Sequence, residues 1–400
     1  MPARRNVVLL TTGAAVSTFG TGLYAVGTVL YITAQYNSPV LVAAFNFVAF
    51  APAAFFARPI GRVVDRCSQK ALLVGSDIAR GLLMLAFAAL LGTRTLHEPG
   101  LLIGFGLLAG LGQAVFVPSV HAYLPRLVEK GELPRANAVR AGGAQLANAL
   151  GMAVAGYLLG VLGLPVLLAA NGLSFLLSAL PEAALRPRRE RPPAPNESGR
   201  LRLGRALTTE PQLRSLLLVN TLMYGISAPV VITIPFILDA GSTEGAATTG
   251  VIFATMIIGG LAGFTAASFA TRRLGREPVM IRLALLLGAG AMGVVALSPT
   301  GTGVVVAAPL LGATAAVVHV GVITLLQRVT APAHRGRTFA TLEAFSAAAA
   351  PVGYVFGGFL GTLLMSRLEA LYAGLAVLIV LTHVATRPAL RRFHDPDSPS

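Results

Sequence analysis

One short charged stretch stands out in a chain that is otherwise poor in charge. Residues 61–70 place Asp65 among basic side chains, between the apolar segments 40–57 and 71–91. A glycine at position 61 lets two backbones approach closely, and a carboxylate can accept hydrogen bonds from the N-terminus of a neighbouring helix. A loop that only marked one side of a membrane would need the basic residues but no Asp65. We expect a charged turn that controls helix contacts, formed by Gly61, Arg62, Asp65, Arg66 and Lys70.

Three further charged residues lie inside apolar segments. Asp77 and Arg80 are three positions apart, and Glu343 lies in a distant segment. Ionisable groups in membrane helices often mark proton pathways, so these three are candidates for a proton or charge network. Because each is expected within about two turns of a cytoplasmic helix end, pairing of the acids with Arg80 and the basic loops is the favoured alternative. No acid is expected near the middle of a span, which argues against a deep carboxylate that binds cationic drugs.

A set of uncharged polar and aromatic residues also falls within the apolar segments. Gln113, Asn148 and Tyr224 are expected nearest the middle of the membrane, where transporters bind their substrates. Hydrogen bonding between helices is the alternative role for each, because polar groups commonly join membrane helices. The candidate cavity residues are Tyr24, Asn46, Gln113, Asn148 and Tyr224.

The sequence offers little support for an enzyme or a metal protein. Cys67 is the only cysteine, so neither a disulfide framework nor a cysteine-based zinc site can form. No nucleophile elbow, dinucleotide-binding glycine motif or cluster of metal ligands is present. The net charge of +15 does not indicate nucleic acid, because the basic residues cluster in short loops between apolar spans. We expect no enzymatic activity, no cofactor and no metal.

The elements that must position these residues are membrane helices. Hydrophobic residues make up 55% of the 400 residues and charged residues only 12%, which leaves too little polar surface for a soluble protein of this length. A helix that crosses a bilayer needs about 20 apolar residues. The first apolar run is too long for a signal peptide and is expected to stay as a membrane helix. Twelve spans are predicted, at about 7–33, 40–57, 71–92, 99–121, 137–160, 163–182, 213–238, 245–269, 279–298, 302–323, 339–363 and 367–386.

Charge placement gives an orientation and two halves. With the N-terminus inside, all of the 31 Lys and Arg residues except Arg94 and Arg367 fall in or next to cytoplasmic connections. Both termini are therefore predicted to be cytoplasmic. The one long connection is rich in arginine and proline and is typical of a linker. The predicted parts are residues 1–182, a cytoplasmic linker at 183–212, and residues 213–400.

An internal repeat agrees with this division. A shift of 202 positions places Arg126 on Arg328, and the same shift places Gly151 on Gly353. The loop after the eighth span is similar to a degenerate copy of the first charged stretch, with Arg272 in the place of Asp65. Two parallel six-helix halves are typical of one class of secondary transporters.

The spacing Gly-x-x-x-Asp-Arg-x-x-x-Lys at 61–70 resembles the signature loop of the major facilitator superfamily (MFS) of transporters. The twelve spans and the half-repeat extend this resemblance over essentially the whole chain. Patterns at 76–80, 124–128 and 136–138 are similar to those of its drug-efflux branch, in the macrolide- and siderophore-exporter group. The glycine run of antiporters in the fifth helix is only partly present, since Met152 stands where the family has proline.

The resemblance implies an all-α MFS fold with 12 transmembrane helices in two pseudo-symmetric six-helix halves. It implies that the 61–70 loop holds the two halves together at the cytoplasmic side in the outward-open state. The expected function is export of a small amphipathic or hydrophobic compound from a bacterial inner membrane, driven by protons and carried out by a monomer. The alternatives are an importer or facilitator of a small polar nutrient and, with less support, a non-transporting membrane enzyme or scaffold.

Overall fold

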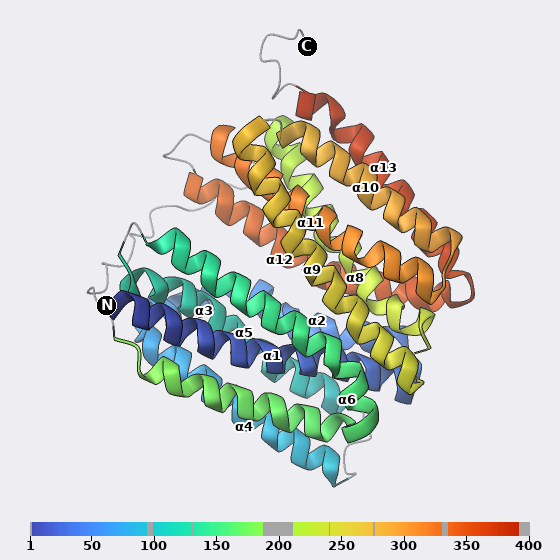
Figure 1. The fold of residues 1–400 in the computed structure, drawn as a ribbon. Coiled ribbons are helices and arrows are strands. Elements are labelled where there is room, and N and C mark those ends of the chain that lie inside the picture. The colour runs from blue at the N-terminus through green and yellow to red at the C-terminus, as the bar shows by residue number, and fades with distance from the viewer. Residues whose placement is uncertain are drawn as a thin grey trace. The chain divides into compact units, whose positions relative to one another are not determined.

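The computed structural model describes residues 2–93, 99–129, 132–186, 211–239, 241–274, 277–329 and 335–391. Within these residues the regular structure is helical throughout (Figure 1). The helices are α1 (Pro2–Tyr36), α2 (Pro39–Phe55), α3 (Ala57–Arg66), α4 (Gln69–Gly92), α5 (Pro99–Leu127), α6 (Leu133–Ala183), α8 (Pro211–Ile237), α9 (Thr243–Leu274), α10 (Glu277–Leu297), α11 (Gly301–Val329), α12 (Arg335–Leu363), the short 3-10 helix η1 (Met365–Arg367) and α13 (Leu368–Arg391).

The predicted all-α membrane fold is confirmed. Nine of the described helices are long and apolar enough to cross a membrane, and two shorter apolar helices occur at Pro39–Phe55 and Ala348–Leu363. The helix α6 covers two of the predicted spans. Gly163, with a φ of 76°, interrupts it between them. A positive φ is accessible to glycine at little cost, and here it allows a tight reversal before Pro165. Counting the two parts of α6 separately gives the twelve predicted spans.

The prediction of a turn at residues 61–70 is wrong for most of the stretch. Residues 57–66 form the helix α3, and α4 begins at Gln69. Arg62 and Arg66 are four residues apart and exposed, and Val64 on another face is only 4% exposed. This amphipathic pattern is typical of a helix that lies along a membrane surface. The proline at position 59 is tolerated because it lies in the first turn, where its missing N–H has no helical partner.

Contacts between Cα atoms divide the chain into two compact units. One consists of Met1–Pro195 with Leu238–Ala254, and the other of Asn196–Ile237 with Thr255–Ser400. Most of the predicted linker at 183–212 lies outside the described residues.

The same helix pairings occur in both halves. In the N-terminal half α1 packs on α6 and α4 packs on α5, and in the C-terminal half α8 packs on α12 and α10 packs on α11. The repeat-related glycines carry two of these contacts: Gly151 lies against the backbone of Phe19, and a Cβ on Gly353 would lie 2.5 Å from the carbonyl oxygen of Gly225. Small residues that allow such close approach are typical of membrane helix packing.

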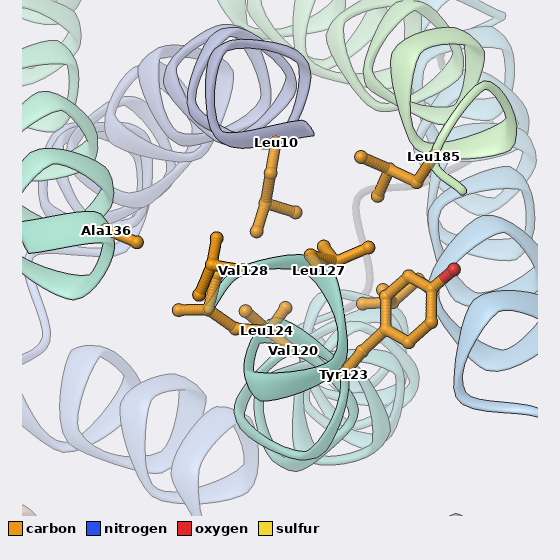
Figure 2. Close-up of a cluster of buried hydrophobic side chains, with 9 residues drawn as sticks. Leu10, Val120, Tyr123, Leu124, Leu127, Val128, Ala136 and Leu185 are labelled. Atoms are coloured by element: carbon orange, nitrogen blue, oxygen red, sulfur yellow. The ribbon is translucent and has the colours of Figure 1, made fainter. Parts of the chain in front are cut away.

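A buried apolar cluster joins several helix ends in the N-terminal half (Figure 2). Leu10 comes from α1, Leu73 from α4 and Leu127 from the end of α5. Ala136 near the start of α6 and Leu185 just after its end complete the same cluster. The helix ends of this half that the sequence analysis placed at one membrane face therefore lie close together.

Polar contacts reinforce this end of the half. Asn6 donates a hydrogen bond from Nδ2 to the carbonyl oxygen of Leu127 at 3.2 Å and another to that of Arg186 at 2.9 Å. These bonds satisfy carbonyl groups at helix ends that have no intrahelical partner.

Candidate functional site

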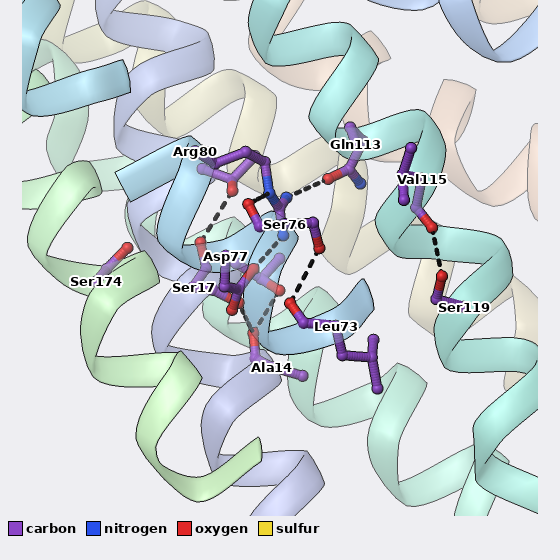
Figure 3. A network of polar contacts seen from close by, with 12 residues as sticks. Ala14, Ser17, Leu73, Ser76, Asp77, Arg80, Gln113, Val115, Ser119 and Ser174 are labelled. Carbon is purple, nitrogen blue, oxygen red and sulfur yellow. Dashed lines mark hydrogen bonds and ion pairs between the residues drawn. The ribbon is translucent and has the colours of Figure 1, made fainter. Parts of the chain in front are cut away.

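Asp77 and Arg80 form a buried ion pair on α4 (Figure 3). Arg80 is 4% exposed and Asp77 is fully buried. The guanidinium donates from Nη2 to Asp77 Oδ1, from Nη1 to Gln113 Oε1 at 2.6 Å, and from Nε to the Ser76 carbonyl oxygen at 3.4 Å. A spacing of three residues places the acid and the base on one helix face. The sequence therefore positions the pair, and α5 supplies Gln113.

Aromatic rings cover the same guanidinium. The Cζ atom of Arg80 lies 4.3 Å from the ring centroid of Phe116 on α5 and 4.3 Å from that of Phe175 on α6. Cation–π contacts of this kind stabilise an arginine that has left water. Arg80 is thus held by three helices.

Two glycines make the room for this arrangement. A Cβ on Gly112 of α5 would lie 2.6 Å from Arg80 Cγ, and a Cβ on Gly81 of α4 would lie 2.8 Å from the side chain of Leu176 on α6. Side chains at these positions would displace the arginine or the helix. The absence of side chains at Gly81 and Gly112 therefore lets α4, α5 and α6 close around Arg80.

The sequence analysis did not select Glu182, which belongs to this cluster. Glu182 lies in the last turn of α6 and is fully buried. The charges of Asp77 and Arg80 both act on its carboxylate. The predicted span 163–182 ends at this residue, so the acid was placed at a helix end and was not selected as a site residue. An acid directly after Pro181 in an apolar run was the available signal.

The predicted cavity residues of the N-terminal half differ in exposure. Tyr24 is buried with its ring edge toward Phe45, at 6.0 Å between centroids. Asn46 is buried and donates to the Val42 carbonyl oxygen of its own helix at 2.9 Å. Asn148 is half-buried, and Gln113 is exposed although its Oε1 accepts from Arg80.

Tyr224 belongs to an aromatic and polar group in the C-terminal half. His319 on α11 lies edge-on to Tyr224 of α8, at 6.4 Å between centroids, and edge-on to Phe264 of α9, at 6.1 Å. The His319 Nδ1 atom lies 3.4 Å from Asn220 Oδ1, and Asn220 donates from Nδ2 to Ser346 Oγ at 2.6 Å. Tyr224 and Phe264 are 40% and 44% exposed. Tyr224 was selected from the sequence as a cavity candidate, but no local pattern places it with His319 and Phe264.

The charged stretch makes contacts within its own half. Lys70 donates from Nζ to the Leu185 carbonyl oxygen at 3.0 Å, and its neighbour Gln69 accepts from Arg126 Nη1 at 2.6 Å. Gly61 is half-buried, while Arg62 and Arg66 are exposed on α3. The side chains of Asp65 and Glu343 lie outside the described part of the structure.

A family model for the Major Facilitator Superfamily matches residues 10–311, which is most of the chain. The chain belongs to the Major Facilitator Superfamily. One similar MFS protein, an uncharacterized transporter from Sinorhizobium fredii (strain NBRC 101917 / NGR234), is 25% identical over 374 residues, covering 91% of this chain and 90% of that protein. Macrolide efflux protein A of Streptococcus pyogenes is 26% identical over 262 residues, which cover 62% of this chain and 64% of the relative.

Solved MFS structures show the same fold at low identity. The nucleoside transporter NupG aligns with a TM-score of 0.78 at 13% identity, covering 95% of this chain and 99% of that one. A bacterial homologue of the iron transporter ferroportin, in an inward-facing state, aligns with a TM-score of 0.75 at 17% identity, covering 96% and 98%. The chain is therefore a multi-pass membrane protein of a transporter family.

Proposed function

We propose that this MFS protein exports a small amphipathic or hydrophobic compound by alternating access, driven by protons. The observation that carries the proposal is the group formed by Tyr224, Phe264 and His319. Two partly exposed aromatic rings offer apolar faces, and an imidazole between them offers a hydrogen-bonding group. Amphipathic compounds need both kinds of contact. The likeness to a macrolide efflux protein supports the same substrate class.

The remaining predicted residues have roles within this proposal. Tyr24, Asn46, Gln113 and Asn148 remain proposed cavity residues of the N-terminal half, and Gln113 is the one whose exposed side chain also reaches the buried charges. Asp77, Arg80 and Glu343 remain the candidate charge network.

The residues 61–70 retain their proposed role as a conformational switch. They comprise Gly61, Arg62, Asp65 and Arg66 on α3, and Lys70 at the start of α4. Within this proposal the protein resides in the inner membrane and acts as a monomer. Both termini are placed in the cytoplasm, since the basic residues of the sequence cluster in the connections assigned to that side.

Binding of a macrolide should depend on Tyr224. An aromatic contact contributes about 0.5–1.5 kcal/mol beyond its area, so Tyr224→Ala should weaken binding by about two- to tenfold. The measurement is the rise in melting temperature of the purified protein in detergent as macrolide is added, because a ligand stabilises the state that it binds.

Phe359→Ala is the matched control, because Phe359 is a 63% exposed aromatic residue of α12 outside the group. It should bind like the wild type. The proposal would be wrong about the cavity if Tyr224→Ala also bound like the wild type. A shift produced by small polar nutrients and not by macrolides would favour the importer.

A further inference from the structure

Glu182 is a buried carboxylate to which the described residues supply no hydrogen bond of full geometry. Both of its carboxylate oxygens are buried. Phe175, Ser178 and Glu182 follow each other at helical spacing on one face of α6. The Ser178 hydroxyl on this face acts on the carboxylates of both Glu182 and Asp77, but among the described residues its geometry falls short of a full hydrogen bond. A buried polar group of this kind calls for an explanation, because native proteins satisfy nearly all of them.

The packing of α4 on α6 places Glu182 beside the ion pair. The two helices are antiparallel neighbours: a Cβ on Gly172 would lie 2.9 Å from the carbonyl oxygen of Gly81, and Phe175 covers Arg80. Asp77, about one turn before Arg80, therefore faces the level of Ser178. Glu182 follows one turn further along α6, and the charges of both members of the pair act on it.

Among the described residues, Arg80 makes no hydrogen bond to the carboxylate of Glu182. Three of the five N–H groups of its guanidinium donate to Asp77, Gln113 and the Ser76 carbonyl oxygen. Phe116 and Phe175 pack against its ring plane. Asp77 still has one buried oxygen, Oδ2, without a described partner. With both acids ionised, the cluster would carry two negative charges against one positive charge, and a buried group in this position is neutralised more readily than it is kept charged.

We propose that Glu182 is a proton-binding residue, which holds a proton while the α4–α6 cluster is closed and releases it when the cluster opens. The step is a simple exchange, in which one carboxylate oxygen gains an O–H bond to a proton from water and no other bond changes. Its role in driving transport rests on the proposed export function, but the binding of the proton does not. A sodium ion is disfavoured because it would lie beside the guanidinium of Arg80, whereas a proton removes charge from the carboxylate itself.

The other charged side chains described near this end of α6 either bond elsewhere or are exposed, as Arg186 is. Lys70 from α4 donates to the Leu185 carbonyl oxygen, and Arg126 from α5 donates to Gln69. The helix α1 meets this part of α6 through Gly13, which lies against Ser178 and Pro181, and its described charged side chain, Arg5, is exposed. Among the described contacts, neither Lys70 nor Arg126 forms an ion pair with Glu182.

The C-terminal half has no copy of the acid–base pair on α4. The shift that places Asp65 on Arg272 also places Gly81 on Gly288, and both of these glycines pack closely against a neighbouring helix. The same shift places Asp77 on Ala284 and Arg80 on Leu287. The charged cluster is therefore not required by the fold that the two halves share, which favours a function for it.

The test is infrared difference spectroscopy of the purified full chain as the pH is raised. The titration starts at about pH 6, where exposed glutamates with an ordinary value of about 4.3 are already ionised. The wild type should lose a carbonyl-stretch band of a protonated carboxyl group as the pH rises. The variant Glu182→Gln, which keeps the shape, should lack this band throughout, and Glu182→Asp should shift it.

The control is Glu132→Gln, because Glu132 is an exposed glutamate at the start of the same helix. It should leave the band unchanged. The inference is overturned if Glu182→Gln retains the band, or if replacing potassium by sodium removes it at constant pH. If the wild type lacks the band but still carries out proton-driven transport, the proton-binding role of Glu182 is refuted and the proposed function is not. If the wild type shows the Glu182 band but transports nothing, the proposed function is refuted and the inference about Glu182 is not.

Discussion

Arg80→Met should lower the free energy of unfolding by about 3–5 kcal/mol, since removing one partner of a buried ion pair leaves an uncompensated charge. Asp77 and Glu182 would then face each other as two buried acids without a cation. Asp77→Asn combined with Arg80→Met should recover part of this loss, because the double variant no longer strands the Asp77 charge. Unfolding in detergent, followed by circular dichroism, measures the difference.

Arg5→Met is the matched control for this change, because Arg5 is an exposed arginine of the same half. It should unfold within about 0.5 kcal/mol of the wild type, as surface substitutions do. If Arg80→Met were as stable as Arg5→Met, the cluster would contribute nothing to the folded state. If the double variant were as unstable as Arg80→Met, the stranded charge of Asp77 would not be the cause.

Gly110→Leu should destabilise the packing of α2 on α5. A Cβ at Gly110 would lie 2.9 Å from the carbonyl carbon of Ala49 and 3.0 Å from its Cα, and backbone atoms cannot rotate away as a side chain can. Overpacking costs about 1–3 kcal/mol, and we expect the upper end of this range. Thermal unfolding in detergent should show a clear loss of stability.

The same helix offers a control for that variant. Gly104 is exposed on α5, and no atom lies within 4 Å of a Cβ built on it. Gly104→Leu should therefore unfold close to the wild type. Equal destabilisation by both variants would mean that helix propensity or insertion, and not the contact with Ala49, decides the result.

The fold was predictable from the sequence to the level of its spans because bilayer-spanning helices leave a strong signal in composition and length. The helix α3 was missed for a physical reason. A surface helix alternates charged and apolar faces, so its charges and its glycine resemble a loop when only hydropathy is considered. The reversal at Gly163 was expected as a boundary between spans, and the structure shows that a single glycine with positive φ is enough for it.

The site was predictable only where its residues are neighbours in sequence. Asp77 and Arg80 lie on one helix face by spacing alone. Gln113, Phe116 and Phe175 reach Arg80 through the packing of three helices, which no local pattern encodes. Glu182 lay at the uncertain edge of a span, and its burial comes from the cluster that closes around the helix ends.

Tyr224 and Phe264, which both contact His319, show the same limit in the C-terminal half. Tyr224 could be selected as a polar aromatic residue near the middle of a span. Its ring contact with His319 joins two helices, α8 and α11, and the two residues are 95 positions apart in the sequence. The aromatic group therefore needed the structure.

The most direct test of the central claim, proton-driven export, is uptake of a labelled macrolide into membrane vesicles of known orientation. Everted vesicles that contain the wild type should accumulate the macrolide when their interior is made acidic. In these vesicles the outer face of the protein faces the lumen, so protons that leave the lumen drive the macrolide into it. The accumulation should disappear when a protonophore collapses the gradient. Accumulation in right-side-out vesicles alone, or accumulation in everted vesicles that no proton gradient affects, would contradict the account.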